Sequence, residues 1–134
     1  MKKIKKMVSQ VTKGIKITVR VDYLTSKIHL NGFVNFFNYE ISIENQSNDN
    51  VQVLRRYWLI KDTLNFDEVV EGAGVIGKKP KLKPYEIFTY SSGSFIKGGA
   101  GSMQGYFTMT NLDTEQLFRV KIPLFCLNVP SIFN

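Results

Sequence analysis

The segment that decides the fold runs from Arg55 to Lys81 and reads RRYWLIKDTLNFDEVVEGAGVIGKKPK. It joins an aromatic, apolar stretch to a glycine-rich loop and then to a basic exit, Lys-Lys-Pro-Lys. Three of its glycines match the pattern GxGxxG, but a dinucleotide site needs a helix that begins directly after such a loop. Pro80 and Pro84 remove backbone donors and bias the residues before them away from helical angles. The segment therefore excludes a Rossmann fold.

Apolar and polar residues alternate along most of the chain, in runs separated by turn-forming residues, and this pattern is typical of β-strands. The runs expected to form strands cover residues 15–22, 37–44, 51–61, 68–70, 84–91, 103–109 and 118–124. The segments 26–32 and 93–102, the second rich in glycine, are expected to be loops. About seven strands and no helical periodicity predict an all-β fold, a two-sheet antiparallel sandwich of the immunoglobulin or fibronectin type III kind.

Three positions make the expected core more specific. The run 51–61 is apolar on both faces toward its end, which predicts a central strand with Trp58 in the core. Pro123 cannot donate to a sheet and indicates an edge or a bulge. Cys126 is expected to be a small buried side chain. Because it is the only cysteine, it excludes an internal disulfide and a cysteine-based zinc site, and we infer a cytoplasmic location.

The length of 134 residues indicates one domain, and we expect a basic flexible tail over residues 1–8 and the domain over residues 9–134. The formal net charge is +7, but Lys2, Lys3, Lys5 and Lys6 supply four of these charges, which leaves +3 for the rest. Charge concentrated in a tail argues against a nucleic-acid surface on the body. No apolar run has the length of a signal peptide's core or of a membrane span.

Several blocks occur in a characteristic order and spacing between about Gly14 and Pro130. They are RYWLI at 56–60, EGAGVIG at 71–77, Leu82 with Pro84, YSSG at 90–93, MQGY at 103–106 and IPLF at 122–125. Together they resemble the bacterial ApaG family. The chain departs from the family's pattern at Lys78-Lys79, at Tyr85 and at Gly98-Gly99-Ala100.

The resemblance implies a fibronectin type III-like sandwich. It also implies a non-enzymatic interaction module, because related domains in eukaryotic F-box proteins and polymerase-delta-interacting proteins look like protein-interaction modules. The bacterial family is associated with cobalt resistance and magnesium efflux. Its glycine motif has prompted suggestions of nucleotide or pyrophosphate binding.

The glycine-rich loop is the candidate binding site for a phosphate-rich small ligand such as pyrophosphate or a nucleoside polyphosphate. Glycines allow successive backbone amides to form an anion-binding nest, and lysines add positive charge. The residues expected to bind the anion are Gly72, Gly74, Gly77, Lys78, Lys79 and Lys81. The alternative is that the glycines only permit tight turns and a close approach over Trp58 or Tyr57.

The other polar candidates have simpler interpretations. Asp67, Glu68 and Glu71 are oxygen ligands of the kind divalent cations prefer, but a solvated acidic turn is favoured, and no metal site or cofactor is predicted. His29 is expected to be a surface histidine, and no catalytic residue is predicted.

A protein partner and a phosphate-containing small ligand therefore remain as binding partners. Single-stranded nucleic acid is disfavoured because most rings alternate inward. A membrane partner is not expected, and a weak homodimer is left open.

Overall fold

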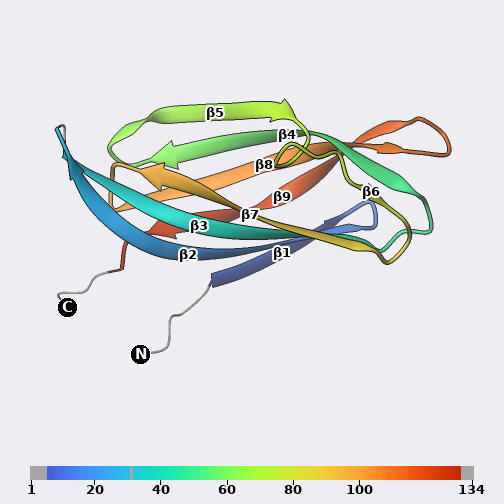
Figure 1. Cartoon of the computed structure of the whole chain (residues 1–134), viewed down its shortest axis with the longest axis horizontal. Coiled ribbons are helices and arrows are strands. Elements are labelled where there is room, and N and C mark those ends of the chain that lie inside the picture. Colours follow the sequence, from blue (N-terminus) through green and yellow to red (C-terminus); the bar gives the residue numbers. More distant parts are fainter. Residues whose placement is uncertain (1–5, 31, 131–134) are drawn as a thin grey trace.

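The computed structural model describes residues 6–30 and 32–130, which fold into nine β-strands with no helix among them (Figure 1). The strands are β1 (Lys6–Thr12), β2 (Ile15–His29), β3 (Gly32–Asn45), β4 (Val51–Asp62), β5 (Asn65–Ala73), β6 (Lys81–Leu82), β7 (Ile87–Ile96), β8 (Ala100–Asn111) and β9 (Leu117–Asn128). The predicted all-β class is thus confirmed, with nine strands instead of about seven.

The strands form two antiparallel sheets that stack into a sandwich, so the predicted architecture is confirmed (Figure 1). The β3 sheet has the order β1-β2-β3-β7, and the β4 sheet has the order β5-β4-β8-β9 with β6 paired to β4. On one side of the sandwich β1 meets β9, where the backbone amide of Lys121 donates to Oγ1 of Thr12 at 3.3 Å. On the other side the edges β5 and β7 are not hydrogen-bonded to each other.

Alternation in the sequence places one face of each sheet in the core. Ile15, Ile17 and Val19 of β2 are fully buried, and each pairs with a buried residue of β3. Trp58 of the central strand β4 is 3% exposed and packs edge-on against Phe125 at 5.9 Å between ring centroids. Its prediction as a core residue is confirmed. Burying such a ring stabilises the sandwich by about 1.5–3 kcal/mol.

Three loop and tail assignments differ from the structure. The segment 26–32 is not a loop, because β2 continues to His29 and β3 begins at Gly32, so the two strands form a long hairpin. The segment 93–102 is also mostly strand, since β7 ends at Ile96 and β8 begins at Ala100. Residues 6–8 of the expected tail pair with β2 as part of β1, and residues 1–5 lie outside the described residues.

A bulge in β9 changes which residues face the core. Met103 pairs with Phe125 and Gly105 with Ile122, so β9 carries one more residue than β8 between these pairs. Pro123 therefore lies at a bulge and on an edge strand, as predicted. The extra residue reverses the alternation, which turns Phe125 inward and leaves Cys126 exposed. The prediction that Cys126 is buried is wrong.

Candidate functional site

The glycine-rich loop is a tight two-residue turn. The amide of Val75 donates to the carbonyl of Lys78 at 2.8 Å, and the amide of Lys78 donates to the carbonyl of Val75 at 2.9 Å. Between them Ile76 and Gly77 have positive φ angles of 43° and 74°. Two successive positive φ values define the type I′ hairpin turn, in which glycine is favoured at the second position. Gly77 thus has a backbone role here.

The other two glycines of the loop also have structural roles. The amide of Gly74 donates to the carbonyl of Leu54 at 2.7 Å, and its φ is 63°. A Cβ at Gly74 would overlap the carbonyl oxygen of Lys78. A Cβ at Gly72 would lie 3.3 Å from both terminal nitrogens of Arg56. Gly72 therefore makes room for the Arg56 side chain.

Several backbone amides that an anion nest would need already donate to backbone carbonyls. The amides of Gly74, Val75 and Lys78 all bond to backbone carbonyls. Lys78, Lys79 and Lys81 are exposed, and Gln52 holds the Lys79 carbonyl at 3.1 Å. The structure thus brings the six predicted residues into one region, and an anion there would have to be held by the lysines and by the amides at the turn's tip. Phosphate binding at this loop stays a prediction.

The three carboxylates of β5 do not converge. Glu71 pairs with Tyr57 and lies on the outer face of the β4 sheet, with Asp67 on the same side of the strand. Glu68, paired with Ile60, faces the gap between the sheets. Within residues 6–30 and 32–130 no three His, Cys, Asp or Glu side chains are grouped as a metal site would require.

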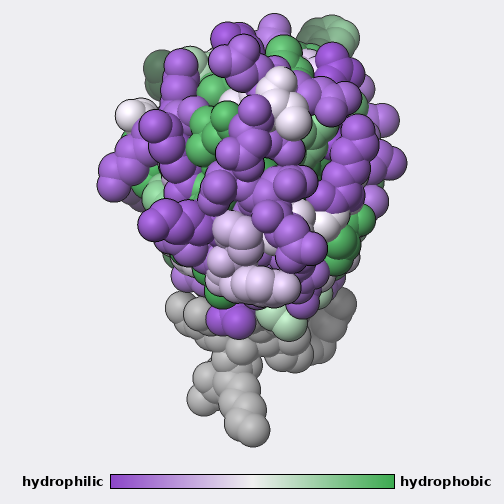
Figure 2. Space-filling view, turned by 90° about the vertical axis from the view of Figure 1, so that its right-hand side faces the viewer, coloured by the Kyte–Doolittle hydropathy of each residue, from purple (hydrophilic) through white to green (hydrophobic). Residues whose placement is uncertain are grey.

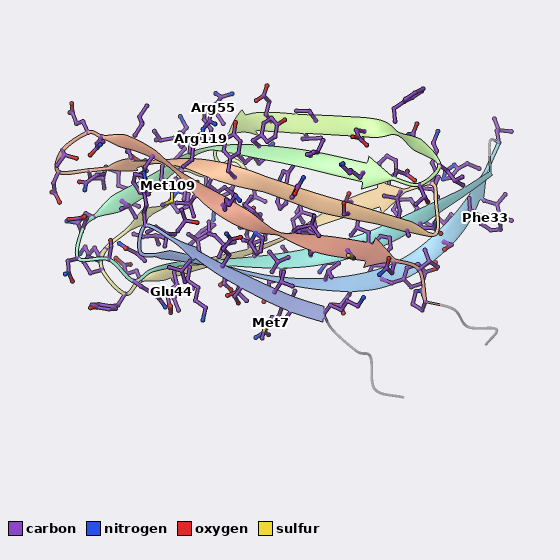
Figure 3. All side chains as sticks on the ribbon, turned by 180° about the vertical axis from the view of Figure 1, so that it is seen from behind. Met7, Phe33, Glu44, Arg55, Met109 and Arg119 are labelled. Carbon is purple, nitrogen blue, oxygen red and sulfur yellow. The ribbon has the colours of Figure 1, made fainter. Side chains whose placement is uncertain are left out.

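One end of the sandwich, which we call the hairpin end, is formed by the tips of three hairpins: residues 24–30 with 32–36 (β2–β3), 62–66 (β4–β5) and 97–99 (β7–β8) (Figure 1). His29 is exposed here, as expected. Figure 3 shows Phe33 at the extremity of the molecule. The large apolar side chains exposed at or beside these tips are Leu24, Ile28, Leu30, Phe33, Leu64, Phe66 and Phe95. The sequence did not indicate this cluster, because its members come from separate strands.

Polar bonds hold the three tips in place. The Asp62 carboxylate accepts the backbone amides of Lys97, Gly98 and Leu64 at 2.7, 2.8 and 3.0 Å. Burial tends to raise the pKa of Asp62, but these bonds and the charge of Lys97 outweigh it and lower the pKa below its usual value. From β3, the Asn35 amide donates to the Gly98 carbonyl at 2.7 Å. These bonds fix the β4–β5 and β7–β8 turns relative to each other and join the second turn to β3 at Asn35.

The opposite end, which we call the turn end, contains the β1–β2, β3–β4 and β8–β9 turns and the segment 83–86 (Figure 1). Its surface is largely hydrophilic (Figure 2). Asn45 is fully buried beneath it and donates to the carbonyls of Asp49 and Leu82 at 2.7 and 3.1 Å. The same side chain accepts the amide of Ser47 at 3.0 Å.

A third surface lies on the outer face of the β4 sheet. The rings of Tyr57 and Tyr106 stack there at 4.8 Å with an interplanar angle of 7°. Arg119 lies over the Tyr106 ring at 4.4 Å from its centroid. Arg55 projects from the same face (Figure 3), and Thr108 lies between it and Arg119 in register. These two rings face outward, in contrast to the buried rings of Trp58 and Phe107 beside them.

Comparison with known proteins agrees with the motif blocks. Residues 27–111 match the family model described as the ApaG domain. Protein ApaG of Brucella abortus (strain S19) is 40% identical over 127 residues, covering 93% of this chain and 95% of that protein. A crystal structure of an ApaA protein from Bordetella pertussis is 30% identical, with a TM-score of 0.79 over 87% of this chain and 94% of that one.

A second solved structure, an X-ray structure of a structural genomics target, has a TM-score of 0.83 and 27% identity, and it covers 90% of each chain. Among the described residues there is no helix long and apolar enough to cross a membrane. A family model that covers more than half of the chain, and a relative this similar over nearly its whole length, agree with each other. The chain belongs to the ApaG family.

Proposed function

We propose that this chain is a non-enzymatic protein-interaction module that docks a protein partner on its hairpin end. The observation that carries the proposal is the exposure of seven large apolar side chains there, from 55% at Phe95 to 105% at Leu30. Exposed apolar clusters on soluble proteins mark interaction surfaces. Aromatic side chains such as Phe33 and Phe66 supply the anchors that dominate protein interfaces.

The hydrogen bonds that fix turns at this end support a role in binding. Asp62 joins the β4–β5 and β7–β8 turns, and Asn35 joins β3 to the β7–β8 turn. A surface that is ordered before binding loses less conformational entropy when the partner arrives. The part of the hairpin end formed by the β4–β5 and β7–β8 turns is therefore suited to be a preformed docking surface.

The names of the relatives state no reaction. The family's association with cobalt resistance and magnesium efflux enters the proposal as an effect exerted through the protein partner in the cytoplasm. This route is consistent with the lack of a grouped set of His, Cys, Asp or Glu in the described part of the chain.

The experiment compares three purified proteins: the wild type, the double variant Leu30→Ser with Phe66→Ser, and Leu117→Ser. Leu117 is 62% exposed at the turn end and is the matched control. Each protein is immobilised, partners are captured from bacterial lysate, and the candidate is purified and titrated directly. We expect the double variant to bind the candidate about tenfold or more weakly, because hot-spot residues each contribute about 2 kcal/mol or more, and the control to bind like the wild type.

Two results would overturn the proposal. One is equal binding of the double variant and the wild type. The other is binding of lipid vesicles, with no purified protein bound, since the hairpin end would then be a membrane contact. Sedimentation of the three proteins across a concentration series tests the weak homodimer, which the double variant should abolish if two hairpin ends pair.

A further inference from the structure

The open side of the sandwich contains a cavity that none of the preceding assignments uses. It has a volume of about 240 Å³ and lies between the free edges β5 and β7. Trp58, Ile60 and Val70 contribute apolar surface, while Tyr39, Arg56, Glu68 and Ser92 contribute polar groups. Pockets for drug-sized ligands begin at roughly 300 Å³. This cavity therefore fits a smaller molecule.

Arg56 is held with its charge at this cavity. One terminal nitrogen, Nη1, donates to the carbonyls of Ala73 and Gly74, both at 3.0 Å. Gly72 leaves the space that the guanidinium occupies. Glu68 lines the same cavity, yet in the described part of the chain no ion pair joins the two side chains. The remaining guanidinium donors are thus positioned and available for an anion.

The Arg56 guanidinium interacts electrostatically with two tyrosines, Tyr39 and Tyr90. Burial raises the pKa of Tyr39, although a hydrogen bond from Ser92 and the charge of Arg56 act in the opposite direction. Burial also raises the pKa of Tyr90, and both Tyr39 and Arg56 are close enough to influence it electrostatically. Both hydroxyls are therefore protonated donors at neutral pH.

Tyr90 adds an independent observation. Its ring is 5% exposed, and its hydroxyl has no hydrogen-bond partner among the described residues. Buried hydroxyls in native structures normally have a partner, so an orphaned one points to a missing water or ligand group. Tyr90 lies next to Ser92 on the inward face of β7, and Tyr39 pairs with Ser92 across the sheet. The unpaired hydroxyl is therefore buried beside this polar cluster, although Tyr90 does not itself line the cavity.

We propose that this cavity binds a small organic acid, with its single carboxylate on Arg56 and the Tyr39 hydroxyl and its apolar body against Trp58 and Ile60. Arginine donors suit a planar carboxylate, and charge-assisted bonds to it are the stronger kind. Glu68 at the rim repels a second negative charge, so polyphosphates are disfavoured here. The site differs in position and ligand class from the glycine-rich loop, and in chemistry from the hairpin end.

The test uses Trp58, the only tryptophan of the chain, as the reporter. Its fluorescence is followed while the full-length protein is titrated separately with benzoate, with benzyl alcohol and with pyrophosphate. Benzyl alcohol is the uncharged analogue of benzoate. We expect saturable binding of benzoate only. Arg55→Gln, on the adjacent residue that faces outward, is the matched control and should bind benzoate normally.

Variants at the cavity identify the contacts. Arg56→Gln should weaken benzoate about tenfold or more, the loss expected for a hydrogen bond to a charged group. Because Arg56 also holds the loop carbonyls, Tyr39→Phe and Ser92→Ala are measured as well. Each removes a hydroxyl group of a residue that lines the cavity, so each should weaken the binding of benzoate. The melting temperature of each free variant shows whether the fold is kept. Glu68→Gln should allow pyrophosphate to bind.

Three results would overturn the proposal. The first is no saturable change of Trp58 fluorescence up to millimolar benzoate. The second is equal binding of benzyl alcohol, which would make the cavity a purely apolar site. The third is unchanged benzoate affinity in both Arg56→Gln and Tyr39→Phe.

Discussion

The two ends of the sandwich solve the same structural problem with different residues. At each end, several turns that connect the strands must be held in place. At the turn end a neutral side chain, Asn45, does this from a fully buried position. At the hairpin end a carboxylate, Asp62, does it from a more exposed position.

The surfaces above these residues differ in the same direction. The turn end is largely hydrophilic (Figure 2), although Tyr85 and Leu117 are exposed there. The hairpin end presents Leu30 and Phe66 at 105% and 91% exposure. Stability is therefore concentrated beneath the turn end, whereas apolar surface available to a partner is concentrated at the hairpin end. Variants at the two ends should separate folding from binding.

The largest effect is expected for Asn45→Ala at the turn end. The variant loses four hydrogen bonds, of which the one to the Leu82 carbonyl is buried. At roughly 1 kcal/mol for each bond, the free energy of unfolding should fall by about 2–4 kcal/mol. Chemical denaturation at neutral pH measures this loss. Asn48→Ala, an exposed asparagine in the same turn, should change stability by less than about 0.5 kcal/mol. Equal effects of the two variants would remove the distinction between buried and exposed bonds.

A smaller loss is expected for Asp62→Asn at the hairpin end. The amide of asparagine cannot accept three backbone donors as a carboxylate does. Because the group is solvent-accessible and therefore screened, the loss should be only about 1 kcal/mol. Asp113→Asn at the turn end is the matched control, and a loss as large in that variant would contradict the role assigned to Asp62.

The contribution of Asp62 to stability should also depend on pH. Its pKa in the folded protein is lower than in the unfolded chain, so its contribution is fully present above the unfolded value. The contribution is lost as the pH falls from that value, 3.8, through the lower folded value. The difference in melting temperature between the wild type and Asp62→Asn should therefore shrink as the pH is lowered from 6 to about 3. A difference that stays constant over this range would show that the carboxylate's charge is not involved.

The smallest change in stability is expected for Leu30→Ser with Phe66→Ser. Both side chains are already in water, so the free energy of unfolding should change by no more than about 0.5 kcal/mol. Ile17→Ser, at a fully buried position of β2, should lose several times more under the same denaturation. A large loss in the double variant would mean that the hairpin end contributes to the fold and is not free for a partner.

Much of this fold follows from the alternation in the sequence, and one of the errors arises from the glycines. The segment 93–102 was interpreted as a loop because of its glycines. Gly101, and Gly105 just beyond, instead serve β8, where a Cβ would overlap the carbonyls of Lys61 and Tyr57 on β4. Glycine at a close approach of strands and glycine in a loop look alike in a sequence.

The bulge at Pro123 shows a related limit. Its presence was predictable from the missing amide, but the direction of the strand after it was not, and Cys126 was placed on the wrong face. The glycine-rich loop was located correctly, although its hydrogen bonds could not be inferred from composition. The cavity at Arg56 was not indicated at all, because Tyr39, Arg56 and Ser92 come from three strands of two sheets.

The acidic residues of β5 have a consequence for the protein's behaviour at high concentration. β5 is the free edge of the β4 sheet, and its unpaired backbone groups could add a strand from another molecule into a growing fibril. Asp67, Glu68 and Glu71 place carboxylates on both sides of that edge. Two such edges meeting in antiparallel or parallel register bring like charges together, which opposes edge-to-edge assembly at neutral pH. The three carboxylates thus oppose pairing between the β5 edges of two molecules.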